Sequence, residues 1–248
     1  MTAGSPSALR IVAFGEQEPG AWGAVWSLDG ASIVALGDGS NVTVGSAALE
    51  GKDRASDWTL RADGIDLTMS GDPDMSVAPD DGTERFDQLC RVSGRFRSGE
   101  TERDVSCLAF RGARVLDRDL ERTDSIRGIG AVFENGDGIG LVAVRPARAK
   151  GHGADAVSAA VLEADGPVDV EDPRLSTTYS HDGRPSRASL ELWIGEIEGE
   201  QRVRRATGEA IGPRASGSLS ALHLSADLFR WHSRGAEGIG VYLLARLG

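Results

Sequence analysis

The chain has 248 residues, of which 40% are hydrophobic and 26% are charged, as in a globular protein with one or two domains. Asp and Glu (38) outnumber Lys and Arg (27), so the formal net charge of -11 makes nucleic acids and anionic membranes poor partners. Because no apolar stretch is long enough to span a bilayer and residues 1–6 lack signal-peptide features, we expect a cytoplasmic protein without stable membrane insertion.

The N-terminal part of the chain alternates apolar and polar residues with period 2, which predicts strands joined by tight turns. Trp22 and Trp26 project from the same face of an early strand. The Asp-Gly pair at 63–64 favours a two-residue type I′ turn, which pairs Leu60 with Leu67 and places the apolar side chains of both strands on one face.

A second hairpin is predicted around residues 98–99, with Cys90 opposite Cys107 and Arg95 opposite Glu102. The two cysteines would be neighbours on a buried face. We interpret them as small core side chains, with a redox or regulatory disulfide as the alternative.

Further hairpins are expected around the turns at 134–137 and 182–185, and residues 222–243 supply the last strands. The total is roughly twelve to fourteen strands. The Ala-rich segment 152–163 is either a helix or another strand. The predicted fold class is all-β and antiparallel, as two lipocalin-like barrel or sandwich units.

A polar stretch with two prolines at 71–82 suggests where these units divide. We expect an N-terminal β-unit over residues 1–75 and a C-terminal lipocalin-like unit over residues 83–248.

Local motifs for phosphate, dinucleotide or metal binding are missing. Gly128-Ile129-Gly130 and Gly138-Ile139-Gly140 fall within strands rather than at strand-to-helix turns, so they do not predict a dinucleotide site. The four histidines are dispersed along the chain. We therefore expect neither a metal nor a cofactor.

Four polar side chains are candidates for acid–base chemistry: Glu134, Tyr179, Glu191 and His223. Glu191 shares a strand face with Trp193, where an indole would raise the pKa of the carboxyl; the alternative is a solvent-facing glutamate. His223 shares a face with Ser225 and Asp227, and the alternative is an outer polar face. For Tyr179, which adjoins a turn, the alternative is solvated loop polarity.

Six aromatic side chains are candidates for lining an apolar pocket that binds a hydrophobic small molecule: Trp22, Trp26, Trp58, Phe110, Phe133 and Trp193. The alternative is a filled core, because an all-β protein of this size needs large buried side chains.

Several segments resemble a known family: residues 85–94, 105–112, 57–64, 176–185 and 230–242. They are similar to the lipocalin-like carotenoid 1,2-hydratases (hydroxyneurosporene synthases) and AttH-type proteins, which resemble the fungal decalin-forming Diels–Alderases in fold. The resemblance implies two lipocalin-like units with an apolar pocket in or between them, and cofactor-free chemistry on a polyene, terpenoid or polyketide.

The chain departs from this family at residues that carry its chemistry. Where the family often has His-Ser-Trp-Gly, this chain has Ala-Arg-Val-Leu at 113–116, and the strand at 138–144 offers no Tyr or Asp as a proton donor. The family's hydratase mechanism is therefore not transferred.

Three functions remain as hypotheses. The first is a cyclase or isomerase that folds a hydrophobic substrate in a shaped pocket. The second is a non-catalytic carrier of a lipophilic molecule. The third is a hydratase or lyase with relocated acids such as Glu134, Glu191 or Tyr179. No oligomeric state is predicted.

Overall fold

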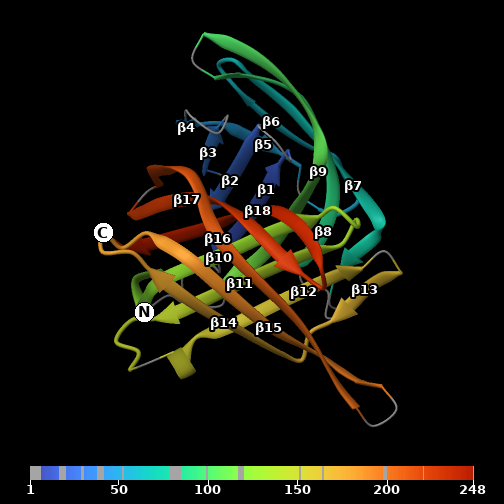
Figure 1. Cartoon of the computed structure of the whole chain (residues 1–248). Coiled ribbons are helices and arrows are strands. Elements are labelled where there is room, and N and C mark those ends of the chain that lie inside the picture. Colours follow the sequence, from blue (N-terminus) through green and yellow to red (C-terminus); the bar gives the residue numbers. More distant parts are fainter. Residues whose placement is uncertain are drawn as a thin grey trace.

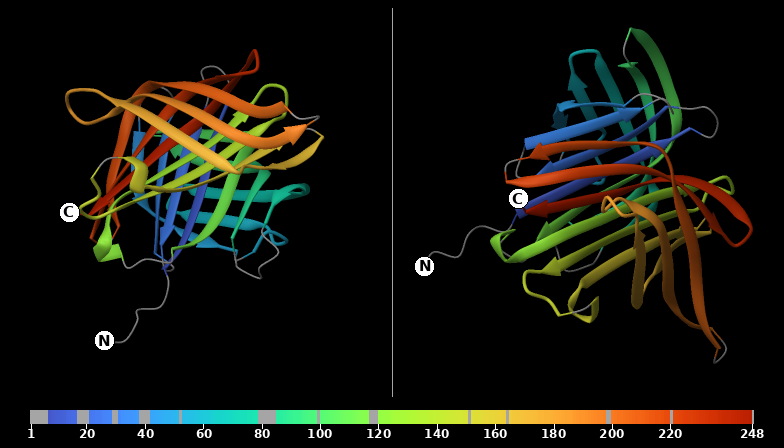
Figure 2. Two further views of the ribbon diagram at one scale, coloured as in Figure 1. Left: turned by 90° about the horizontal axis from the view of Figure 1, so that it is seen from below. Right: turned by 60° about the vertical axis from the view of Figure 1, so that its left-hand side comes forward.

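The computed structural model describes residues 7–16, 21–28, 31–37, 42–51, 53–78, 85–98, 100–116, 120–150, 152–163, 165–197, 200–219 and 221–247. These residues form two antiparallel nine-stranded sheets that pack against each other (Figure 1). The prediction of an all-β, antiparallel protein built from two units is confirmed. One sheet closes into a nearly complete barrel and the other forms a half-barrel. Figure 2 shows both curved sheets from two further directions.

The first sheet contains β1 (Ser7–Gly15), β2 (Trp22–Leu28), β3 (Ala31–Gly37), β4 (Val42–Ser46), β5 (Ala48–Glu50), β6 (Trp58–Ala62), β7 (Ile65–Val77), β8 (Phe86–Ser98) and β9 (Thr101–Leu116). The second sheet contains β10 (Thr123–Phe133), β11 (Gly138–Pro146), β12 (Ala156–Glu163), β13 (Gly166–Asp169), β14 (Asp172–Tyr179), β15 (Pro185–Ile197), β16 (Glu200–Leu219), β17 (Leu222–Ser233) and β18 (Ala236–Leu247). Two 3-10 helices, η1 (Leu120–Arg122) and η2 (His152–Ala154), complete the described elements.

Both sheets have the same topology. The strand order is β4-β3-β2-β1-β9-β8-β7-β6-β5 in the first sheet and β13-β12-β11-β10-β18-β17-β16-β15-β14 in the second. In each, the first strand pairs with the last, so the sheet is an up-and-down ring interrupted between its fourth and fifth strands. The chain passes from one sheet to the other after Leu116. In the segment at 71–82, which was expected to separate two units, residues 71–77 belong to β7, and β7 pairs with β8 within the first sheet; residues 79–82 lie outside the described ranges.

The local hairpin predictions are largely confirmed. Leu60 pairs with Leu67 across the turn at 63–64, so the predicted register is confirmed. The predicted type I′ turn is wrong, because that turn needs positive φ at both central residues and here Gly64 has φ +70° whereas Asp63 has no positive φ. In the second hairpin the prediction was wrong by two residues: Cys107 lies opposite Val92, and Arg95 lies opposite Asp104. A shift of two positions keeps every side chain on its predicted face, because the side-chain period of a strand is two residues. Residues 152–163 contain the short η2 and strand β12 rather than a long helix.

Three hydrophobic cores follow from the curvature of the sheets. One core contains side chains of the first sheet alone, including Trp58, and another contains side chains of the second sheet alone, including Trp231. The third core lies between the sheets, where side chains such as Trp26 from β2 meet Leu224 and others from β17. Both faces of the central strands are therefore buried, and the two sheets share the core that lies between them.

Glycines on β10 and β11 make the contact between the sheets possible. A Cβ on Gly140 would lie 2.3 Å from ring atoms of Phe110, and one on Gly128 would lie 2.8 Å from Cδ1 of Ile11. Side chains of the first sheet thus press directly on the backbone of the second. This packing, rather than a nucleotide, accounts for the two Gly-Ile-Gly segments.

Within the described ranges, no helix has the length and apolar character needed to cross a membrane.

Candidate functional site

The inner face of the second sheet changes in character along its length. On β17, every second residue from His223 through Asp227 to Trp231 points to this face. Unbroken pairing with β18 places His223 opposite Arg246, Ser225 opposite Leu244, and Asp227 opposite Tyr242. The face is therefore polar near His223 and aromatic near Trp231.

A cavity of about 410 Å³ opens at the polar end of this face. It is lined by Asp182, Gly183, Arg214, Ser216, Gly217, Ser218, His223, Leu224, Ser225, Leu244 and Arg246. The volume is within the usual range of small-molecule sites, and the lining combines charged and hydroxyl groups with apolar Leu244. This cavity is the candidate functional site.

Arg214, on one side of the cavity, forms an ion pair with the fully buried carboxylate of Asp227. The Asp227 side chain accepts hydrogen bonds from Nε of Arg184 at 2.6 Å and from Nε of Arg214 at 3.3 Å. Burial raises the pKa of the Asp227 carboxyl, while the two guanidinium groups oppose that rise. Asp227 lies behind the cavity lining and orients Arg214 toward it.

A bulge in β16 gives Arg214 its position. Pairing between β16 and β17 is interrupted between Ile211 and Ala215, and Gly212 there adopts φ +70°. The Gly212 carbonyl accepts a hydrogen bond from Nη2 of Arg184 at 2.8 Å. Bulges re-aim side chains in this way beside functional sites.

A buried tyrosine lies below the cavity, next to Asp227. The Tyr242 hydroxyl is 2.9 Å from Oγ1 of Thr177, and burial raises the pKa of Tyr242. Its ring stacks on Phe229 at 5.4 Å, and Phe229 stacks on Trp231 at 5.6 Å. These rings fill the middle of the second sheet's interior, so the cavity does not continue through it.

The outer rim of the cavity carries His223 and Arg246. Nδ1 of His223 lies 3.3 Å from the Ser218 hydroxyl on the neighbouring strand. The Arg246 guanidinium lies 5.9 Å from the ring centroid of Tyr179. Of the predicted acid–base candidates, His223 lines this cavity, and Tyr179 lies outside its lining, beside Arg246.

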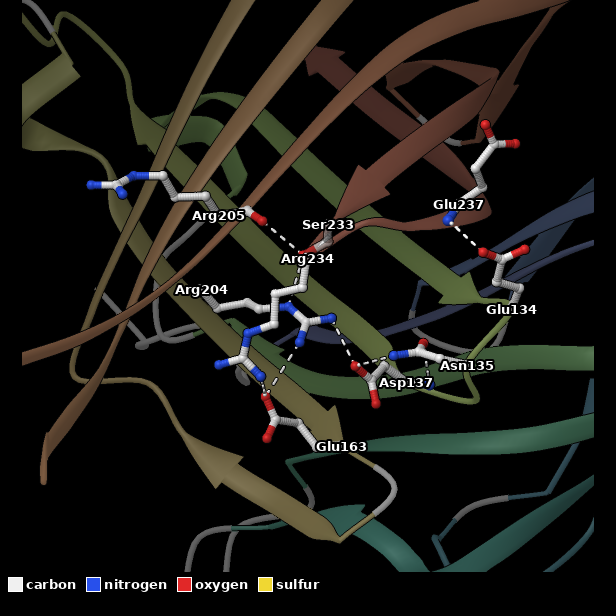
Figure 3. A network of polar contacts seen from close by, with 9 residues as sticks. All are labelled: Glu134, Asn135, Asp137, Glu163, Arg204, Arg205, Ser233, Arg234 and Glu237. Atoms are coloured by element: carbon white, nitrogen blue, oxygen red, sulfur yellow. Dashed lines mark hydrogen bonds and ion pairs between the residues drawn. The ribbon is translucent and has the colours of Figure 1, made fainter.

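The opposite end of the second sheet's interior is closed by a polar network (Figure 3). The fully buried Arg204 donates to Asp137 at 2.8 Å, to Ser233 at 2.7 Å and to Glu163 at 3.3 Å. Arg234 also donates to Glu163, at 2.6 Å. Because its donors and acceptors are matched, this network stabilises a closed end.

The other two acid–base candidates lie away from the cavity. Glu134 is exposed in the turn after β10 and accepts a hydrogen bond from the backbone N–H of Glu237 at 3.2 Å. Glu191 is on the outer face of β15, where Nε of Arg205 lies 3.2 Å from its carboxylate. Trp193 shares that outer face, with Arg174 over its ring.

The six aromatic candidates do not meet in one pocket. Trp22, Trp26 and Phe110 lie between the sheets, Trp58 lies inside the first sheet, and Phe133 lies inside the second. The apolar cavity beside Trp26 measures about 20 Å³, room for about one water molecule. The aromatic residues between the sheets are therefore packed core.

A further cavity of about 320 Å³ lies where Phe86 and Asp87 of β8 approach Ala159 and Val170. Asp87 is buried and forms an ion pair with Arg114 there. The lining of this cavity adjoins residues 79–84, which are outside the described ranges. Among the described residues, no group of three or more His, Cys, Asp or Glu side chains is placed to hold a metal ion.

The sequence did not predict that Asp227 and the arginines bound to it would support the cavity lining. The alternative interpretation from the sequence placed His223 and Asp227 on an outer polar face. Both residues lie instead on the inner face of the second sheet. Phe229 and Trp231 share their face, so aromatic continuity along β17 was the available signal. Arg184 and Arg214 gave no local signal, because Arg184 reaches Asp227 from the turn before β15 and Arg214 reaches it from an irregular segment of β16 between Ile211 and Ala215.

Comparisons with known proteins identify the fold. No protein-family model matches the sequence, and no curated protein sequence matches it. CghA, solved with Sch210972, aligns with a TM-score of 0.64 and 10% identity over 98% of this chain and 89% of its own. A Nitrosomonas europaea protein described as AttH (NE1406) aligns with a TM-score of 0.63 and 10% identity over 98% and 92%.

Kievitone hydratase from Nectria haematococca aligns with a TM-score of 0.55 and 10% identity, over 98% of this chain and 89% of its own. These matches confirm the predicted resemblance in fold. The chain therefore has the two-sheet, lipocalin-like architecture of proteins that include a small-molecule hydratase and a structure with a bound small molecule.

Proposed function

We propose that the protein is a cofactor-independent enzyme that moves a proton on a small organic molecule bound at the inner face of the second sheet. The carrying observation is the 410 Å³ cavity at which His223, Arg214 and Arg246 converge. The reactions that fit are isomerisation, hydration and elimination next to a carbonyl group. The names of kievitone hydratase and CghA's ligand Sch210972 support a small-molecule substrate.

His223 is the proposed catalytic residue. It lines the cavity at an accessible position, and imidazole readily accepts and returns a proton near neutral pH. Ser218, at 3.3 Å from Nδ1, orients the ring. Arg214 is positioned by Asp227 to stabilise negative charge that develops on the substrate oxygen.

A shape-driven pericyclic cyclase, the first hypothesis from the sequence, requires space beside the aromatic residues. The cavity of about 20 Å³ beside Trp26 does not accommodate a polyene. Proton-transfer chemistry therefore fits the available cavity better than pericyclic chemistry does.

The test is a reaction in D₂O followed by mass spectrometry, with a panel of unsaturated carboxylic acids, hydroxy acids and ketones. Isomerisation through solvent exchange and hydration each place a solvent proton on carbon, so their products gain deuterium. Elimination removes a proton from carbon, so it is followed in the reverse direction, as hydration of the unsaturated compound. We expect His223→Gln to lower the rate about 100-fold or more. The matched control is His232→Gln, since His232 is an exposed histidine on the same strand.

Unchanged turnover in His223→Gln, or a rearranged product without deuterium, would contradict the proposal. Asp227→Asn tests the supporting role of the buried carboxylate. We expect it to lower kcat while the circular dichroism spectrum stays unchanged.

A further inference from the structure

Positive charge gathers at the candidate site although the protein is strongly acidic. Arg214 and Arg246 line the cavity, and Arg184 pairs with Asp227 behind the lining, in a chain whose formal net charge is -11. Two carboxylates, Asp182 and Asp227, oppose them. The three guanidinium groups at and behind the lining thus exceed the two carboxylates by one.

The two carboxylates are already occupied by other partners. Asp182 accepts hydrogen bonds from the Ser180 hydroxyl and from the backbone N–H of Arg184, and these bonds lower its pKa. Asp227 is shared between Arg184 and Arg214. Arg246 forms no ion pair with any residue that the structure describes; its contact is the ring of Tyr179. Its charge therefore lacks a carboxylate within the described site.

Arg214 and Arg246 approach the cavity from opposite sides. Arg214 is on β16 and Arg246 is on β18, while β17 lies between these strands and contributes Ser225. Asp227 engages Nε of Arg214, and Nη2 lies 3.4 Å from the Gly183 carbonyl. Nη1 makes no hydrogen bond to the described residues, so it is available to a ligand.

Hydroxyl donors complete this arrangement. Ser216 and Ser225 lie opposite each other on β16 and β17, and both line the cavity. A planar anion placed between the arginines would accept hydrogen bonds from guanidinium and hydroxyl groups together. Guanidinium groups bind such oxyanions through paired, charge-assisted hydrogen bonds.

We infer that the cavity recognises small organic molecules through an anionic oxygen group, a carboxylate or a phosphate, held between Arg214 and Arg246. The apolar remainder of the molecule lies toward Leu244, and the carbon next to the anion faces His223. This inference rests on the proposed function for its reaction, but the anion site itself is defined by binding alone.

Isothermal titration calorimetry with cinnamate, phenyl phosphate and cinnamamide tests the inference. The two anions share an aromatic body and differ in the oxyanion, whereas the amide matches cinnamate in shape without its charge. We expect at least one anion to bind about tenfold or more tightly than the amide, and the tighter anion identifies the preferred group. Binding should weaken as NaCl concentration rises.

Arg246→Gln should weaken anion binding about tenfold or more, because one charge-assisted contact is lost. Arg246 is exposed, so the variant is expected to fold. Arg230→Gln is the matched control: it makes the same charge change at an exposed site outside the cavity lining. Equal binding of cinnamate and cinnamamide, no binding of either anion, or equal affinity of both variants would overturn the inference.

The two proposals fail separately. Anion binding that depends on Arg246, combined with unchanged turnover in His223→Gln, keeps the anion site and removes the catalytic role of His223. Turnover that depends on His223 without anion preference keeps the enzyme and removes the anion site.

Discussion

Single buried charges determine what each end of the second sheet's interior can do. At the cavity end, Asp227 supports two arginines, one of which faces the cavity. At the other end, Arg204 satisfies Asp137 and Glu163 in a closed network. The same kind of ion pair therefore supports an accessible site in one place and a sealed end in the other.

Arg204→Met should destabilise the fold by about 3–5 kcal/mol, because it leaves the buried Asp137 without the arginine that pairs with it, while Glu163 keeps its ion pair with Arg234. The neighbouring Arg205→Met is the control. Arg205 is 65% exposed and pairs with Glu191 on the outer face, so its loss should cost about 0–1 kcal/mol. Urea unfolding measures both values, and equal stabilities of the two variants would contradict this role of Arg204.

The cysteines provide a second prediction at this scale. Burial raises the pKa of Cys90 and of Cys107 to about 12, so almost no thiolate exists at pH 8. Native protein should therefore react slowly with Ellman's reagent at pH 8, faster as pH rises, and completely once unfolded. Rapid reaction of the native thiols at pH 8 would show that they are accessible and ionised.

Individual strands explain which parts of the structure the sequence could predict. The register of the hairpin at 58–69 was predictable residue by residue because the Asp-Gly pair marks a two-residue loop, and the length of the loop sets the register even though the turn is not of type I′. The hairpin containing Cys90 and Cys107 was displaced by two residues, since alternation fixes the face but not the partner. His223 was assigned an uncertain face because it is exposed at one end of β17, on the same side as the buried Asp227, and both faces of the strand are buried only over residues 226–229.

The contact between sheets depends on the glycines of β10 and β11. Gly140→Ala should cost about 1–3 kcal/mol, because the new methyl group would lie 2.3 Å from the Phe110 ring. Gly45→Ala is the control: no atom lies within 4 Å of its added Cβ, so its effect should be small. Thermal unfolding compares them, and a Gly140→Ala protein as stable as the control would show that the ring moves freely.

At the level of the whole molecule, two sheets with the same topology share a core that neither sheet encloses alone. This arrangement was not readable from the sequence, because β1 pairs with β9 and β10 pairs with β18 across long separations. The proline-containing stretch at 71–82 looked like a boundary, yet its residues 71–77 belong to β7, which pairs with β8 in the same sheet. Long-range strand pairing, rather than local composition, sets the division between the sheets.

The shared core predicts that the two sheets unfold together. Trp58 reports on the first sheet and Trp231 on the second, so variants that retain only one of them give separate fluorescence signals. We expect coincident urea transitions, which also coincide with loss of circular dichroism. Two separated transitions would show that each sheet is stable without the core between them.

The central claim is that a small molecule binds at the inner face of the second sheet, not among the aromatic residues between the sheets. A crystal structure with 4-bromocinnamate locates the ligand independently of any assay, because bromine gives an anomalous signal. We predict that the bromine lies within the cavity near Leu244. The carboxylate of the ligand should lie between Arg214 and Arg246. Bromine between the sheets beside Trp26, or its absence from the cavity at saturating concentration, would contradict this account.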